Sequence, residues 1–200
     1  MQSGINNIYE MGVLKRNVII WAVFQIILWA VFGIAYSFNV NSWGNVSGTE
    51  YVAANSDGLL KTFFIIIINN LILFSFIVLG NVFVRFHLFT PGLLILLLQG
   101  VMIGWVAGSN SFEFPFASVS QANIQYLKVG LWETTAYALA CAVTLTKSLN
   151  IADTFPAKQW SKVRKIKEIS LSVAEKRLFS IGILLLIISA YVEAVLITIV

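Results

Sequence analysis

The chain has 200 residues, of which 58% are hydrophobic and 11% are charged, with a formal net charge of +4. Soluble domains carry about 25% charged residues, so this composition excludes an ordinary soluble protein and indicates an integral membrane protein. The basic residues gather mainly in one segment, which favours contact with a membrane surface over binding of nucleic acid. The single cysteine, Cys141, excludes an intramolecular disulfide.

Five apolar segments approach the length of about 20 residues that a helix needs to cross a bilayer. Pro91 suits the first turn of the third segment, because its missing N–H would be unpaired there in any case. We predict an all-α membrane protein, a five-transmembrane-helix bundle that forms one integral membrane domain over residues 1–200. The predicted spans are about 18–38, 62–85, 91–109, 126–146 and 178–200.

Most of the charge lies between the fourth and fifth predicted spans. Over residues 161–177, the apolar residues Val163, Ile166 and Val173 recur at helical spacing among basic residues. This pattern predicts a basic amphipathic helix on the cytoplasmic surface, which either lies on anionic lipid or binds an acidic partner. The residues expected to make this contact are Lys162, Arg164, Lys165 and Lys167.

The distribution of basic residues predicts the orientation in the membrane. With a cytoplasmic N-terminus and five spans, all of the 13 Lys and Arg residues except Lys61 and Lys128 fall on the cytoplasmic side. Cytoplasmic segments carry an excess of Lys and Arg. We therefore predict a multi-pass protein of the cell membrane, with the N-terminus cytoplasmic and the C-terminus outside.

Several polar side chains interrupt the predicted spans. Counted at 1.5 Å per residue, each lies roughly 10–15 Å below the predicted outer end of its helix. A polar group at this depth needs a partner other than lipid, so we predict one buried cluster. Such a cluster would hold the helices together, line a path for a proton, ion or solute, or recognise a transmembrane helix of a partner. Its members would be Asn69, Asn70, Gln99, Glu133 and Glu193.

Small residues recur along two of the predicted helices. Glycines every fourth residue on the third span allow a second helix to approach closely, and alanines do so on the fourth. We expect these two faces to pack against each other, although the glycine face could equally serve a homo-oligomer. The predicted packing residues are Gly100, Gly104, Gly108, Ala136 and Ala140.

Among the possible classes of function, an enzyme is the one that the residues of this chain support least. No Asp lies within a predicted span, and the only histidine, His87, lies in a short cytoplasmic turn. A Ser–His pair or a histidine-bearing metal site therefore cannot form inside the membrane. No phosphate-binding Gly-rich loop is present. We predict no catalytic residues, no metal and no cofactor.

Four short motifs occur in a characteristic order over about Thr62 to the C-terminus. They are Asn69-Asn70, Gln99-Gly100, Gly130-Leu131-Trp132-Glu133 and Ala190-Tyr191-Val192-Glu193-Ala194. This ordered set resembles the stage II sporulation protein M family. The resemblance implies a membrane scaffold, because the founding members act with cell-wall hydrolases during engulfment in sporulating bacteria.

The sequence thus predicts an integral membrane scaffold or assembly factor that organises envelope or membrane-remodelling partners. Its expected partners are the lipid bilayer, an envelope or cytoplasmic protein, and a second copy of the chain, but not nucleic acid. The alternative is a small oligomeric transporter for a proton, ion or solute that uses Glu133 and Glu193. A transporter would explain two buried glutamates better, whereas a scaffold better explains the packed faces and the basic segment.

Overall fold

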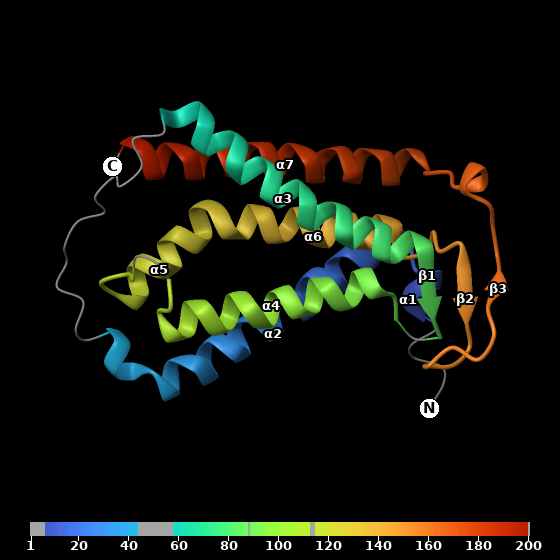
Figure 1. The fold of residues 1–200 in the computed structure, drawn as a ribbon, viewed down its shortest axis with the longest axis horizontal. Helices are drawn as coiled ribbons and strands as arrows, with labels where there is room; N and C mark the ends of the chain where they lie inside the picture. The colour runs from blue at the N-terminus through green and yellow to red at the C-terminus, as the bar shows by residue number, and fades with distance from the viewer. Residues whose placement is uncertain (1–6, 44–57, 88, 113–114, 200) are drawn as a thin grey trace.

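The structure is a computed structural model that describes residues 7–43, 58–87, 89–112 and 115–199. Its core is a bundle of long helices with a small sheet at one end (Figure 1). Four helices are long and apolar enough to cross a membrane, which confirms a mostly helical chain with candidate membrane-spanning helices. They are α2 (Val13–Phe38), α3 (Gly58–Phe83), α4 (Pro91–Ser109) and α7 (Val173–Ile199).

The predicted fourth span is built differently from the other four. It is a continuous helical run of three parts, α5 (Val119–Gln125), the π-helical turn η2 (Tyr126–Gly130) and α6 (Leu131–Thr144). α6 contacts α2, α3, α4 and α7 and lies between the α3–α7 pair and the α2–α4 pair (Figure 1). Because protein surrounds it, α6 can carry small and polar residues that a lipid-facing helix could not. α6 is not among the four apolar helices because, at 14 residues, it is shorter than a helix that crosses a bilayer on its own.

The glycine face of α4 packs against α2. A Cβ atom added to Gly100 would lie 3.2 Å from the ring of Phe24, and one added to Gly104 would meet the carbonyl oxygen of Leu28. The prediction that this face meets the alanines of α6 is therefore wrong. Ala136 is fully buried and instead lies near Gly182 of α7, where an added Cβ would be 3.4 Å from the Ala136 carbonyl oxygen.

A three-stranded sheet closes one end of the bundle. β1 (Val84–Phe86) follows α3 and pairs in parallel with β2 (Asn150–Ala152), which pairs antiparallel with β3 (Ser161–Lys162). The short helix α1 (Asn7–Glu10) lies at the same end, whereas α7 ends at the opposite end of the bundle (Figure 1). A one-turn 3₁₀ helix, η1 (Val40–Trp43), follows α2.

The prediction of an amphipathic helix over residues 161–177 is wrong. The segment contains β3 and the 3₁₀ turn η3 (Ile166–Glu168), and α7 begins at Val173. Pairing of β3 with β2 holds the first part extended. A capping box then starts α7: the Ser172 amide donates to Glu175 Oε2 at 2.8 Å, and the Glu175 amide donates to Ser172 Oγ at 3.2 Å. The Ser-x-x-Glu spacing was readable in the sequence and marks this boundary.

Candidate functional site

A hydrogen-bonded group joins α3 to α6. The side-chain amide of Asn70 donates to Glu133 Oε1 at 2.5 Å, and the Tyr137 hydroxyl donates to Asn70 Oδ1 at 3.1 Å. Glu133 and Tyr137 are one helical turn apart on α6, so both reach the same asparagine. The structure thus gives Asn70 and Glu133 the protein partners that an intramembrane amide and carboxyl need.

The other predicted members of the polar cluster are placed differently. Glu193 of α7 is half-buried and lines the same cavity as Glu133. Asn69 is exposed on the outside of α3, because successive residues of a helix point about 100° apart. Gln99 of α4 is half-buried, and its side chain makes no hydrogen bond to any described residue. The structure therefore brings Asn70, Glu133 and Glu193 together, but not the whole predicted set.

A cavity of ≈ 170 Å³ lies between α2, η2, α6 and α7, and residues of α4 and α5 also line it. α5 and η2 lie towards the end of the bundle that is distant from the sheet (Figure 1). Its walls combine two carboxylic acids with aromatic rings. The rings of Trp29 and Tyr126 are in an edge arrangement with centroids 5.6 Å apart. The acidic and aromatic side chains that line the cavity are Trp29, Phe32, Phe112, Tyr126, Glu133 and Glu193.

The π-helical turn η2 positions Tyr126 in the cavity wall. A Cβ atom on Gly130 would lie 2.6 Å from the Tyr126 ring, so only glycine leaves room for this ring position. The Tyr126 hydroxyl donates to Gln25 Oε1 at 2.8 Å, which ties the turn to α2. π-Helical turns of this kind occur frequently at functional sites, and this one ends three residues before Glu133.

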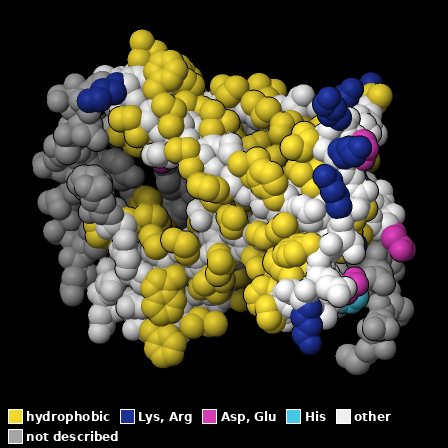
Figure 2. Space-filling model, turned by 45° about the vertical axis from the view of Figure 1, so that its right-hand side comes forward, with side chains coloured by type: hydrophobic (Ala, Val, Ile, Leu, Met, Phe, Trp, Pro, Cys, Tyr) yellow, Lys and Arg dark blue, Asp and Glu magenta, His cyan; other side chains and the backbone are white. Residues whose placement is uncertain are grey.

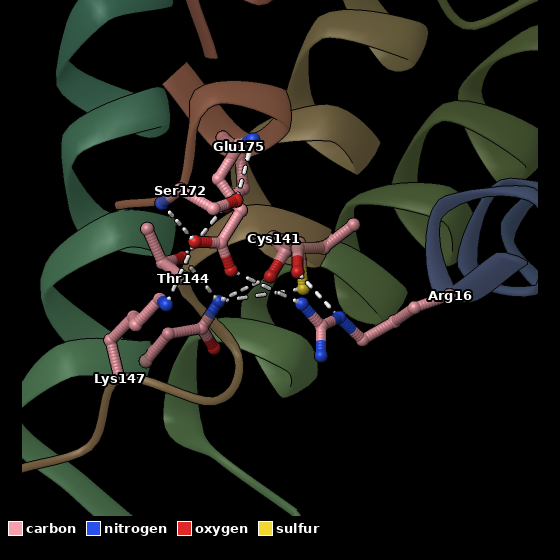
Figure 3. A network of polar contacts seen from close by, with 9 residues as sticks. Arg16, Cys141, Thr144, Lys147, Ser172 and Glu175 are labelled. Atoms are coloured by element: carbon pink, nitrogen blue, oxygen red, sulfur yellow. Dashed lines mark hydrogen bonds and ion pairs between the residues drawn. The ribbon is translucent and has the colours of Figure 1, made fainter. Parts of the chain in front are cut away.

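A second polar network lies nearer the sheet and was not predicted as a site (Figure 3). Arg16 of α2 is 3% exposed, and its Nε donates to the Ala142 carbonyl oxygen at 2.6 Å. Glu175 of α7 pairs with Lys147 Nζ at 2.9 Å and with the Arg16 guanidinium at 3.8 Å. In the sequence, the basic flank of the first span indicates only the orientation in the membrane, and Glu175 falls within the predicted amphipathic helix.

Asn81 is the centre of the same network. Its fully buried side chain donates to Thr144 Oγ1 at 2.9 Å and to the Cys141 carbonyl oxygen at 3.2 Å. It also accepts a 2.5 Å hydrogen bond from the Thr90 hydroxyl. Thr90 is itself the N-cap of α4, so Asn81 ties α3, the start of α4 and α6 together. The sequence signal for this role is that Asn81, a polar residue, interrupts an apolar run and therefore needs a partner.

Apolar residues separate the two polar layers along the helices. Phe24 of α2, Ile77 of α3 and Leu186 of α7 are each 0% exposed, and each lies along its helix between residues of the two polar layers. On α6, Ala140 fills the corresponding position and is also fully buried. The polar groups thus form two separate interhelical contacts on either side of a buried apolar layer.

The predicted membrane-contact residues lie on β3 and the segment that follows it. Lys162, Lys165 and Lys167 are exposed and Arg164 is half-buried. The neighbouring apolar side chain of Ile166 is 69% exposed. On the face shown in Figure 2, most Lys and Arg side chains lie at one end, beyond a broad band of hydrophobic side chains. Basic and apolar residues thus alternate on a surface beyond the bundle.

Comparisons with protein-family models, with curated proteins and with solved structures find no match. Within the part of the chain that the structure describes, no group of three or more His, Cys, Asp or Glu residues could hold a metal ion. The two polar layers, the cavity and the basic segment are the features of the structure that bear on function.

Proposed function

We propose that this protein is an integral membrane scaffold or assembly factor that organises envelope or membrane-remodelling partners, as the resemblance to stage II sporulation protein M implies. The observation that carries the proposal is the pairing of polar side chains across helices. Asn70 with Glu133, and Asn81 with Thr144, join different helices, and a fully buried apolar layer that includes Phe24 and Leu186 separates them. Such contacts hold a bundle together without providing a polar path through it.

The proposed topology has five spans, with a cytoplasmic N-terminus and an outer C-terminus. In addition to the four long apolar helices, it treats the α5–η2–α6 run as a crossing, the fourth along the chain, which its neighbours shield from lipid. It is supported by the position of α1 and the sheet at one end and of the end of α7 at the other (Figure 1). The excess of basic residues near the sheet fits a cytoplasmic location for that end.

The partner-binding surface in this proposal is the basic segment around Lys162, Arg164, Lys165 and Lys167. Exposed Ile166 lies among these cations, and a surface that combines cations with an apolar side chain suits anionic lipid headgroups or an acidic protein segment. Because the segment lies outside the bundle, it is available to partners without unfolding the core.

The test is site-specific photocrosslinking in intact membranes, with the crosslinker at exposed Ile166. Changing Lys162, Arg164, Lys165 and Lys167 to Gln should abolish the crosslinked protein band. A matched variant changes four other exposed basic residues to Gln and removes the same charge: Lys15, Lys158, Lys176 and Arg177. That variant should retain the band, and equal loss in both variants, or no band in the wild type, would contradict the proposal.

A small oligomeric transporter for a proton, ion or solute remains a second candidate. The cavity that contains Glu133 and Glu193 favours it, because two carboxylic acids within a membrane protein often mark an ion or substrate path. In that case flux across liposomes would require both glutamates. The scaffold is preferred because a buried apolar layer lies between the cavity and the second polar network.

A further inference from the structure

We infer that the cavity between α2, η2, α6 and α7 is a binding site for a small organic cation of the alkylammonium class. The inference goes beyond the scaffold role and does not depend on it. A scaffold can bind such a ligand without moving it across the membrane. Three features of the cavity support the inference: its carboxylic acids, its aromatic walls and its size.

Among the described residues, none forms an ion pair with either carboxylic acid of the cavity. One oxygen of Glu133 accepts the hydrogen bond from Asn70, and its other oxygen makes no hydrogen bond with a described residue. Glu193 lines the same space, and no described residue donates a hydrogen bond to its carboxylate. An unpaired carboxylate within the membrane is costly. A bound cation would therefore stabilise both groups.

The remaining walls favour an organic cation. Trp29 and Tyr126 stand edge to face at 5.6 Å, and Phe32 packs on Trp29 with ring centroids 5.5 Å apart. The Tyr126 hydroxyl is engaged by Gln25, so Tyr126 contributes chiefly its ring. Aromatic faces attract cations within about 6 Å, and aromatic cages recognise alkylated ammonium groups. The acids and rings together match a positively charged head with methyl or methylene groups.

Size and ligand chemistry narrow the class further. The cavity of ≈ 170 Å³ is smaller than the roughly 300–1,000 Å³ of pockets for drug-sized ligands. It is close to the roughly 150 Å³ that admits benzene in an engineered cavity. A hard metal cation prefers about six to eight oxygen ligands. Only Glu133, Glu193, Asn123 and Gln125 bring carboxylate or amide oxygens to the lining, whereas four other lining residues are aromatic. The expected ligand therefore has only a few non-hydrogen atoms.

The experiment is isothermal titration of the purified full-length protein in lipid nanodiscs with tetramethylammonium chloride. Saturable binding is expected for the wild type. Glu193→Gln should weaken it at least about tenfold, because the neutral amide removes the charge attraction. Trp29→Leu should also weaken it by about tenfold through the lost cation–π contact.

Two matched variants serve as controls. Glu168→Gln neutralises an exposed carboxylate on η3, and Trp105→Leu removes an indole that is 49% exposed on α4. Both should bind tetramethylammonium as the wild type does. The melting temperature of every variant is measured first, and Trp29→Leu keeps the test valid if Glu193→Gln fails to fold.

Three results would overturn the inference. The first is no saturable binding to the wild type. The second is unchanged affinity in a folded Glu193→Gln or Trp29→Leu variant. The third is displacement of tetramethylammonium by potassium chloride at equal concentration, which would make the cavity an inorganic-ion site. A failed photocrosslinking experiment would not affect this test, since crosslinking reports on the basic segment at the other end of the bundle.

Discussion

The side-chain amide of Asn70 on α3 donates a hydrogen bond of 2.5 Å to the carboxylate of Glu133 on α6. Hydrogen bonds between membrane helices contribute about 0.6 kcal/mol on average, with a maximum near 1.7 kcal/mol. Removing one partner also leaves the other group unsatisfied in the protein interior, which costs more than the bond itself. This contact therefore stabilises the packing of α3 against α6, and its loss should measurably lower the stability of the protein.

Asn70→Ala should lower the free energy of unfolding by about 1–3 kcal/mol, because it leaves the Glu133 carboxylate and the Tyr137 hydroxyl without their shared partner. Asn69→Ala removes the same chemical group from the exposed side of α3 and should change stability by less than about 0.5 kcal/mol. Thermal unfolding in one detergent measures both. Equal destabilisation by the two variants would show that the assignment of faces on α3 is wrong.

Asn81→Ala should destabilise the bundle by about 2–4 kcal/mol. It removes contacts to Thr144 and the Cys141 carbonyl and leaves the Thr90 hydroxyl unpaired. Gln99→Ala is the matched control, because that amide makes no hydrogen bond to described residues. Denaturant unfolding of the two variants should differ by more than about 1 kcal/mol, and a smaller difference would argue against Asn81 as the centre of the network.

Gly104→Ala should separate α2 from α4, because the new methyl group would meet the Leu28 carbonyl oxygen of α2. Overpacking of this kind costs about 1–3 kcal/mol. Gly33→Ala on α2 adds the same methyl group where nothing lies within 4 Å. It should instead gain about 0.5–1 kcal/mol from the better helix propensity of alanine. Melting temperatures that move in the same direction would contradict the α2–α4 packing.

Glu175→Ala should cost about 2 kcal/mol or more, since it removes the cap of α7 and the partner of both Arg16 and Lys147. Glu168→Ala also removes a carboxylate that accepts a backbone N–H, but at the exposed turn η3. Its effect should stay within about 0.5 kcal/mol. Hydrogen exchange of the first turn of α7 checks the mechanism, and it should rise only in Glu175→Ala.

The lengths of the helices could be predicted from the sequence better than their contacts. The predicted bounds 91–109 agree with α4 because Thr90 and Pro91 start it, and Asn110, at a φ of 54°, ends it in the left-handed conformation. Glycine spacing predicted a close approach on α4, yet it carries no information about which helix approaches. The apolar run of α3 likewise could not decide whether Asn69 or Asn70 faces the bundle.

The errors near the sheet have a different origin. Strands of two or three residues such as β3 leave almost no periodic signal, so the helical spacing of apolar residues over 161–177 predicts a helix instead. The Arg16–Glu175 ion pair joins residues that are far apart in the sequence, and no local pattern predicts it. The cavity could not be foreseen either, because it depends on where Trp29 of α2 meets Tyr126 of η2.

The central claim is that the buried polar residues hold the helices together and do not form a conducting path. The most direct test is proton and potassium flux into liposomes that contain the wild type, Glu133→Gln or Glu193→Gln, with each melting temperature measured alongside. We predict wild-type flux no faster than in empty liposomes, and a melting temperature of Glu133→Gln close to that of the wild type, because glutamine still offers an oxygen to the Asn70 amide. Wild-type flux that disappears in both variants while they melt like the wild type would contradict this account and establish a transporter.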